Sequence, residues 1–187
     1  DLEPTIDLGG QVALVTGASS GLGRRFAALL AANGARVVAT GRRMERLADL
    51  ATEIEATGGT CLPLQLDVTD AEQLAAVVST AEAELGPVQI LVNNAGIPDA
   101  QYATKMELEL IDRVLDTNLR APYVLSCEVA RRLIDLQLPG RMVNISSVGG
   151  FHYSGGGAAL YSITKAGVNR LTETLAVEWS RFDINVN

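Results

Sequence analysis

Short apolar runs rich in β-branched residues alternate with longer amphipathic stretches along this chain, and the alternation limits its possible folds. Strands buried on both faces read as continuous apolar runs, whereas the helices that connect parallel strands read as amphipathic stretches. The expected strands lie at residues 12–16, 36–40, 60–66, 90–93 and 141–145, with another beginning at 184. The expected helices lie at about residues 22–33, 44–56, 71–85, 107–136 and 160–181. The pattern predicts an α/β fold, with a doubly wound parallel sheet and helices on both faces.

The length of the chain predicts one domain. Its 187 residues suffice for one α/β domain with a substantial core and are too few for two. We expect a single domain over residues 1–187, with residues 1–8 as a lead-in. The chain begins at Asp1 without methionine and stops at Asn187 inside an apolar strand pattern, so we expect further sequence beyond Asn187.

Residues 107–136 form too long a stretch for one average helix. Pro122 lies inside it, and proline lacks the N–H that a helix interior needs. We therefore expect two helices that meet near residues 117–122.

The charge of the chain argues against two classes of partner. The net charge is −7, and the basic clusters are no longer than a pair such as Arg42-Arg43, so we expect neither nucleic acid nor membrane as a partner. No basic-then-apolar leader pattern is present, which predicts a cytoplasmic protein.

Cys61 and Cys127 lie among apolar residues and are expected to be free thiols. His152 is the only histidine, and we expect no metal site.

The segment Thr16-Gly-Ala-Ser-Ser-Gly-Leu-Gly23 joins the first strand to the first helix. Its glycines permit a sharp turn and close backbone approach, and a helix N-terminus offers N–H groups to phosphate. The spacing differs from the G-x-G-x-x-G fingerprint, so a glycine-rich connection without a ligand remains an alternative. Its place after the first strand of a βαβ series favours dinucleotide binding.

The end of the second strand predicts which dinucleotide binds. An acidic residue there would bond the ribose 2′-OH of NAD, but the strand ends Thr40-Gly-Arg-Arg43 without a carboxylate. Arg42 can instead form a charge-assisted contact with the 2′-phosphate of NADP. The alternative is that both arginines begin a helix in solvent. We expect NADP, with NAD less favoured.

Tyr161 and Lys165 stand four residues apart at the start of an expected helix, which places them on one face. A cation beside a phenol stabilises the phenolate and so makes the tyrosine a better proton donor near neutral pH.

Taken together and in this order, these segments resemble the short-chain dehydrogenase/reductase family from about residue 8 to residue 187. The resemblance is carried by residues 16–23, Leu66-Asp-Val68, Asn93-Asn-Ala-Gly96, Asn118, Asn144-Ile-Ser-Ser147 and the Tyr161/Lys165 pair. It implies a Rossmann-like fold whose cofactor contacts are Gly17, Ser19, Ser20, Gly21, Leu22, Gly23, Arg42, Asp67, Val68, Asn94, Ala95, Gly96, Tyr161 and Lys165.

Some of these residues also have simpler interpretations. Asp67 can belong to a turn or cap a helix, and Asn93-Asn94 can form a plain turn.

The resemblance further implies a catalytic group of Asn118, Ser147, Tyr161 and Lys165. Ser146 is the alternative to Ser147. His152, in the loop after these serines, is either a substrate contact or an exposed loop residue. That loop contains an added glycine within residues 155–157, which leaves its shape open.

These features predict an oxidoreductase that reduces a ketone or 3-oxoacyl group with NADPH, or runs in reverse. The alternatives are a non-catalytic NADP-binding scaffold, an NAD-dependent alcohol or polyol dehydrogenase, and an epimerase or dehydratase. An intact catalytic group argues against the scaffold. The resemblance also suggests a homo-oligomer, either tetramer or dimer, that packs through residues 107–136 and 160–181.

Overall fold

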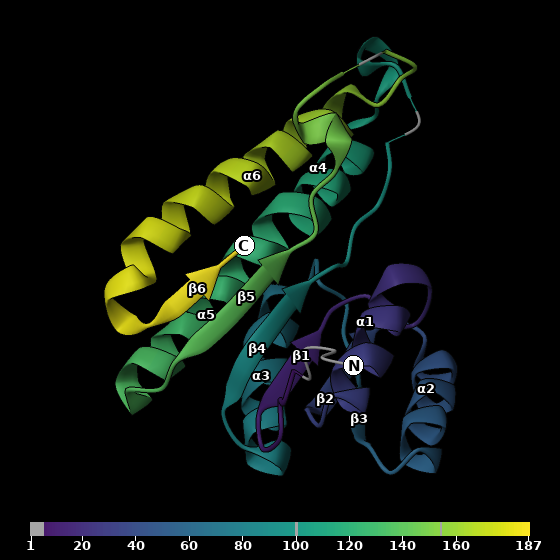
Figure 1. Cartoon of the computed structure of the whole chain (residues 1–187). Helices are drawn as coiled ribbons and strands as arrows, with labels where there is room; N and C mark the ends of the chain where they lie inside the picture. Colours follow the sequence, from purple (N-terminus) through teal and green to yellow (C-terminus); the bar gives the residue numbers. More distant parts are fainter. Residues whose placement is uncertain (1–5, 100, 154) are drawn as a thin grey trace, which may run out of the picture.

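The sheet at the centre of the molecule has six parallel strands in the order β3-β2-β1-β4-β5-β6 (Figure 1). The computed structural model describes residues 6–99, 101–153 and 155–187, so part of the expected lead-in lies outside the described residues. The strands are β1 (Val12–Val15), β2 (Arg36–Gly41), β3 (Thr60–Gln65), β4 (Val88–Asn93), β5 (Gly140–Asn144) and β6 (Ile184–Val186).

Helices cover both faces of this sheet. The α-helices are α1 (Gly21–Ala32), α2 (Met44–Ala56), α3 (Ala71–Leu85), α4 (Leu108–Leu115), α5 (Ala121–Leu136) and α6 (Ala159–Trp179). Side chains of α1 and α2 form one apolar core with β1 and β2, including Leu47 and Val37. Side chains of α3, α5 and α6 form a second core on the other face, including Leu74, Leu125 and Trp179. The doubly wound α/β fold predicted from the alternation is confirmed, and so is the Rossmann-like arrangement that the family resemblance implied.

The strand order indicates where a ligand-binding site can lie. Strand order reverses between β1 and β4, since β2 and β3 extend to one side and β5 and β6 to the other. Ligands of open parallel sheets bind beyond the carboxyl ends of the strands at such a reversal. The segments that follow β1, β2, β4 and β5 are therefore the ones that can build a site.

Two helices meet near residues 117–122, as expected: α4 ends at Leu115 and α5 begins at Ala121. They are joined by a π-helical turn, Asp116–Arg120, and the backbone stays right-handed helical throughout. Pro122 has no N–H to donate to the Asn118 carbonyl four residues earlier, and a wider turn tolerates this loss without a kink. The π turn carries Asn118, which is 1% exposed, into the interior.

No helix in the described ranges is long and apolar enough to cross a membrane.

Both cysteines are free: Cys61 is buried on β3 and Cys127 is half-buried on α5. Burial raises the pKa of the Cys61 thiol to about 11, and the thiolate is the reactive form. We expect iodoacetamide near pH 8 to label Cys61 in the folded protein roughly a hundredfold more slowly than free cysteine. Mass spectrometry of the Cys61 peptide measures this. Labelling as fast in buffer as in concentrated urea would contradict it.

Candidate functional site

The turn between β1 and α1 has the shape that an anion requires. Gly17 and Gly21 adopt φ angles of +67° and +57°, which disfavour residues with a Cβ. Ser20 is the N-cap of α1 in an extended conformation, its side chain makes no hydrogen bond to the N–H groups of the helix, and no acidic residue occupies the first helical turn. The N–H groups at this helix end therefore meet no competing carboxylate in the first turn of α1.

Thr16 and Asn94 hold this turn against β4. The Thr16 hydroxyl accepts from the backbone N–H groups of Asn94 and Ala95, each at 3.0 Å. The Asn94 amide donates in return to the Thr16 carbonyl at 2.9 Å and the Gly17 carbonyl at 3.3 Å. Two strand ends are thus joined at the sheet's point of reversal.

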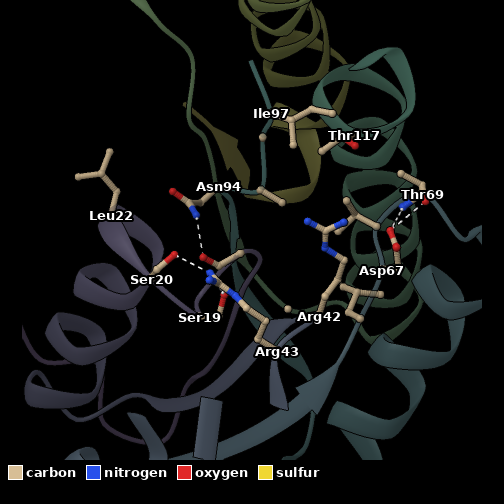
Figure 2. Close-up of a pocket in the computed structure, with 16 residues that line it drawn as sticks. Ser19, Ser20, Leu22, Arg42, Arg43, Asp67, Thr69, Asn94, Ile97 and Thr117 are labelled. Carbon is tan, nitrogen blue, oxygen red and sulfur yellow. Dashed lines mark hydrogen bonds between the residues drawn. The ribbon is translucent and has the colours of Figure 1, made fainter. Parts of the chain in front are cut away.

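A pocket of about 550 Å³ opens beside this turn (Figure 2). Ten predicted cofactor residues line it: Gly17, Ser19, Ser20, Leu22, Arg42, Asp67, Val68, Asn94, Ala95 and Gly96. The other four, Gly21, Gly23, Tyr161 and Lys165, lie outside its lining. Most of the predicted contacts therefore meet in one cavity, while the expected proton donor, Tyr161, is not part of its lining.

The two arginines that follow β2 differ in what they contact. Arg43 donates to the hydroxyls of Ser19 and Ser20, each at 2.9 Å. The exposed side chain of Arg42 extends inside the pocket on the side of Asp67 (Figure 2). Arg43 therefore supports the turn, and Arg42 presents its guanidinium to the cavity.

Asp67 forms a local turn while also lining the pocket. Its Oδ1 accepts from the backbone N–H of Thr69 at 3.0 Å and from the Thr69 hydroxyl at 2.9 Å. Helix α3 is capped instead by Asp70, which accepts from the N–H groups of Glu72 and Gln73. The turn interpretation of Asp67 is confirmed and the capping interpretation is wrong.

Tyr161 and Lys165 share one face of α6, as their spacing predicts. Lys165 Nζ lies 5.6 Å from the centre of the Tyr161 ring and donates to the Ile145 carbonyl at 2.6 Å. Lys165 is 5% exposed, and this burial lowers its pKa. A Cβ built on Gly96 would lie 3.7 Å from Lys165 Nζ. Gly96 therefore connects the pocket to this pair.

The hydroxyls of Ser146 and Ser147 are used differently. Ser146 donates to the Lys165 carbonyl at 3.2 Å and so ties the loop after β5 to α6. Ser147 accepts from the Gly149 N–H at 3.1 Å, which leaves its own proton for another acceptor. A Cβ on Gly149 would touch both Ser147 Oγ, at 3.4 Å, and the Tyr161 ring, at 3.9 Å. Ser147 is thus a neighbour of Tyr161 with an available donor.

The Asn118 side chain joins segments from three parts of the chain. Its Oδ1 accepts from the Ile97 N–H at 2.8 Å, and its Nδ2 donates to the Ile97 carbonyl at 2.9 Å. The same Nδ2 lies 3.3 Å from the Thr164 hydroxyl on α6. The four residues expected to act together are therefore brought to one end of the sheet.

The family model for short chain dehydrogenases matches residues 11–187. The chain belongs to this family. Its relatives include a 2-dehydro-3-deoxy-D-gluconate 5-dehydrogenase of Formosa agariphila, 33% identical over 97% of this chain and 68% of the relative. Another is the 3-oxoacyl-[acyl-carrier-protein] reductase FabG of Thermotoga maritima, 38% identical over 96% of this chain and 72% of the relative.

Solved structures agree with this membership. A short-chain dehydrogenase/reductase from Mycobacterium marinum superposes with a TM-score of 0.93 at 35% identity, over 98% of this chain and 72% of that one. A metagenomic short-chain oxidoreductase in complex with NADP superposes with a TM-score of 0.89 at 36% identity, over 95% of this chain and 80% of that one.

Several residues at the site of this short-chain dehydrogenase were not predicted from its sequence. No motif in the sequence indicates a role for Arg43, which donates to the Ser19 hydroxyl, or for Asp99, which accepts from the Tyr161 N–H. The pocket is also lined by Gly41, Arg43, Leu66, Thr69, Ile97 and Thr117. In the sequence, Arg43 and Ile97 are marked as pocket residues only by their positions, one directly after Arg42 and the other directly after the Asn93-Asn-Ala-Gly96 segment.

Gly23 in this short-chain dehydrogenase is expected to tolerate no side chain. A Cβ there would lie 2.5 Å from the Gly17 carbonyl oxygen and would also press on the Asn94 amide. We expect Gly23→Ala to destabilise the fold by about 1–3 kcal/mol and to weaken NADPH binding by roughly tenfold or more. Urea unfolding and fluorescence titration measure the two effects. Wild-type NADPH affinity in the variant would contradict this account of the turn.

Proposed function

We propose that this short-chain dehydrogenase reduces a ketone or 3-oxoacyl group to a secondary alcohol with NADPH, or catalyses the reverse reaction. The observation that carries the proposal is the Tyr161/Lys165 pair on α6, with its ammonium next to Gly96 at the edge of the pocket. A proton donor thus stands beside a cavity suited to a dinucleotide.

The residues of the pocket fit NADP. The backbone at Gly17 lies so close to Gly23 that a side chain at position 23 would not fit, and a pyrophosphate needs the backbone N–H groups of this turn. Arg42 offers a guanidinium to a 2′-phosphate. Gly96 places no side chain between the pocket and Lys165, and the nicotinamide ribose would lie there. When bound, the reduced nicotinamide supplies a hydride for the substrate's carbonyl carbon.

Tyr161 acts as the general acid. Its phenol donates a proton to the substrate's carbonyl oxygen, and Ser147 donates a hydrogen bond that strengthens as negative charge develops there. Lys165 stabilises the phenolate that remains, because its buried ammonium lies near the Tyr161 ring and the Ile145 carbonyl accepts from it. Ammonium has three donors, so others remain for the phenol and the ribose.

Asn118 supports this arrangement from the π turn. It holds the Ile97 backbone next to Gly96 and reaches Thr164 on α6. We assign it to the group that returns a proton to Tyr161 through Lys165 and water. In the reverse direction Tyr161 accepts the alcohol's proton.

Similarity to sugar-acid dehydrogenases favours a second candidate. A gluconate 5-dehydrogenase of Gluconobacter oxydans is 37% identical over 96% of this chain and 70% of the relative. Oxidation of a polyol or sugar acid would use the same groups in reverse and could use NAD. The absence of an acidic residue at the end of β2 favours NADP over NAD, and therefore favours the reductase.

We further propose that the protein is a cytoplasmic homo-oligomer. An apolar groove of about 620 Å³ runs between the α4–α5 region and α6, where Leu119, Tyr123 and Leu171 line it. Tyr123 is 52% exposed, so it is available for a contact between copies of the chain. Sedimentation velocity would detect a dimer or tetramer, and a monomer at micromolar concentration would contradict the proposal.

Steady-state assays with NADPH and NADH on a series of ketones and 3-oxoacyl thioesters test the proposed function. We expect alcohol formation with a clear preference for NADPH. A preference for NADH would overturn the cofactor assignment. Oxidation of sugar acids without reduction of any ketone would support the second candidate.

A further inference from the structure

Helix α6, which carries Tyr161 and Lys165, begins without a capping side chain of its own. Its N-cap residue is Ala158, which makes no side-chain hydrogen bond, and no acidic residue lies in the first turn. The first N–H groups of a helix have no partner within the helix. The start of α6 therefore depends on a group from another part of the chain.

Asp99, in the loop after β4, supplies that group. Its Oδ2 accepts from the Tyr161 N–H at 3.0 Å across a separation of 62 residues. Asp99 is 1% exposed, and a carboxylate at a helix N-terminus also interacts favourably with the helix dipole. The capping bond falls on the backbone of the expected proton donor itself.

This bond closes a ring of contacts around the Tyr161 backbone. The Thr164 hydroxyl donates to the Tyr161 carbonyl at 2.7 Å and accepts from Asn118 Nδ2 at 3.3 Å. Asn118 in turn holds both the N–H and the carbonyl of Ile97, two residues before Asp99. Tyr161 is thus fixed at its N–H and at its carbonyl by groups anchored to each other.

Burial of Asp99 has a cost that reduces the stability gained from this bond. Its Oδ1 is buried and has no hydrogen-bond partner among the described residues. A buried polar atom without a partner is unfavourable, and a carboxylate is more so. A smaller neutral cap would avoid that cost, which indicates that stability alone does not explain a buried side chain of this length at the start of α6.

We propose that Asp99 is a positioning residue, which holds the Tyr161 backbone and thereby sets where the phenol lies relative to Gly96 and the cofactor pocket. The inference rests on the proposed role of Tyr161 as general acid. Among the described residues, the Asp99 side chain accepts a hydrogen bond from the Tyr161 N–H, and Asp99 does not line the cofactor pocket. We therefore expect it to act through Tyr161 and not by contact with substrate.

The test compares Asp99→Ala with Asp99→Asn in the purified protein. We expect Asp99→Ala to lower kcat roughly 10- to 100-fold, because small displacements of a reacting group are costly. The dissociation constant for NADPH should stay within about twofold, since Asp99 does not line the pocket. Asparagine keeps an oxygen acceptor at the same distance, so Asp99→Asn should recover kcat to within about threefold.

Asp70→Ala is the matched control. Asp70 caps α3 through the Glu72 and Gln73 N–H groups at 2.9 and 3.1 Å, so its loss removes a comparable cap. Both alanine variants should lower Tm by about 2–4 °C, but Asp70→Ala should keep the wild-type kcat. Equal losses of kcat in Asp99→Ala and Asp70→Ala would overturn the proposal. So would a wild-type kcat in Asp99→Ala, or a kcat in Asp99→Asn that is as low as that of Asp99→Ala.

Hydrogen exchange gives a readout that does not depend on activity. Amides at the start of α6 should exchange faster in Asp99→Ala, keep their protection in Asp99→Asn and be unaffected in Asp70→Ala. Unchanged protection in Asp99→Ala would overturn the capping bond, whatever the enzyme does. A Tyr161→Phe variant that retains activity would contradict the proposed function. An active wild type together with a wild-type kcat in Asp99→Ala would contradict only the positioning role of Asp99.

Discussion

Replacing Tyr161 with phenylalanine is expected to lower kcat for ketone reduction by about 10²–10⁴-fold, the usual contribution of a positioned general acid. The ring stays, so its packing near Lys165 Nζ, 5.6 Å from the ring centre, is preserved while the transferable proton is lost. NADPH affinity should change by no more than about twofold, because Tyr161 does not line the pocket. Kinetics at saturating substrate and fluorescence titration measure the two quantities separately.

Tyr123→Phe is the control for this substitution. Tyr123 is a half-exposed tyrosine on α5, away from the pocket, and its variant should keep the wild-type kcat. A Tyr161→Phe variant whose kcat lies within about tenfold of the wild type would remove Tyr161 from the role of general acid.

Arg42→Ala is expected to raise KM for NADPH by about 10- to 100-fold, the effect of losing hydrogen bonds to a charged group. KM for NADH should barely change, because NADH lacks the 2′-phosphate that Arg42 would bind. Arg42 lies in the pocket and makes no hydrogen bond with another described residue, so its removal should leave the fold intact. Initial rates with each cofactor measure the shift in preference.

Two other arginines make this prediction specific. Arg131→Ala, on an exposed part of α5, changes net charge equally and should affect neither cofactor. Arg43→Ala should weaken both cofactors, because Arg43 holds the Ser19 and Ser20 hydroxyls of a turn that both would use. An unchanged ratio of NADPH to NADH kinetics in Arg42→Ala would show that Arg42 does not read the 2′-phosphate.

Local patterns were sufficient for the parts of the site that depend on local structure. The spacing of Tyr161 and Lys165 correctly placed them on one face of α6, because helix periodicity alone determines that relation. Ten of the cofactor residues that the family resemblance implied line the pocket. They follow strands of one parallel sheet, and the ends of such strands meet at one edge.

Contacts between distant segments were beyond this reasoning. Pro122 was compatible with either a break or a continuous turn, and the bonds from Asn118 to Ile97 are part of what holds the π turn inward. Asp99 contributes through a partner 62 residues away, a relation that no periodicity or composition encodes. The roles of Ser146 and Ser147 likewise became distinct only once their hydrogen-bond partners were known.

The most direct test of the proposed function is product formation by the wild-type protein. NADPH and a panel of simple ketones and 3-oxoacyl thioesters would be incubated with the protein, and cofactor oxidation would be compared with the secondary alcohol found by chromatography. We predict one alcohol formed for each NADPH consumed. NADPH that binds but is not consumed with any ketone, together with no oxidation of alcohols by NADP⁺, would contradict a reductase and support a non-catalytic NADP-binding scaffold.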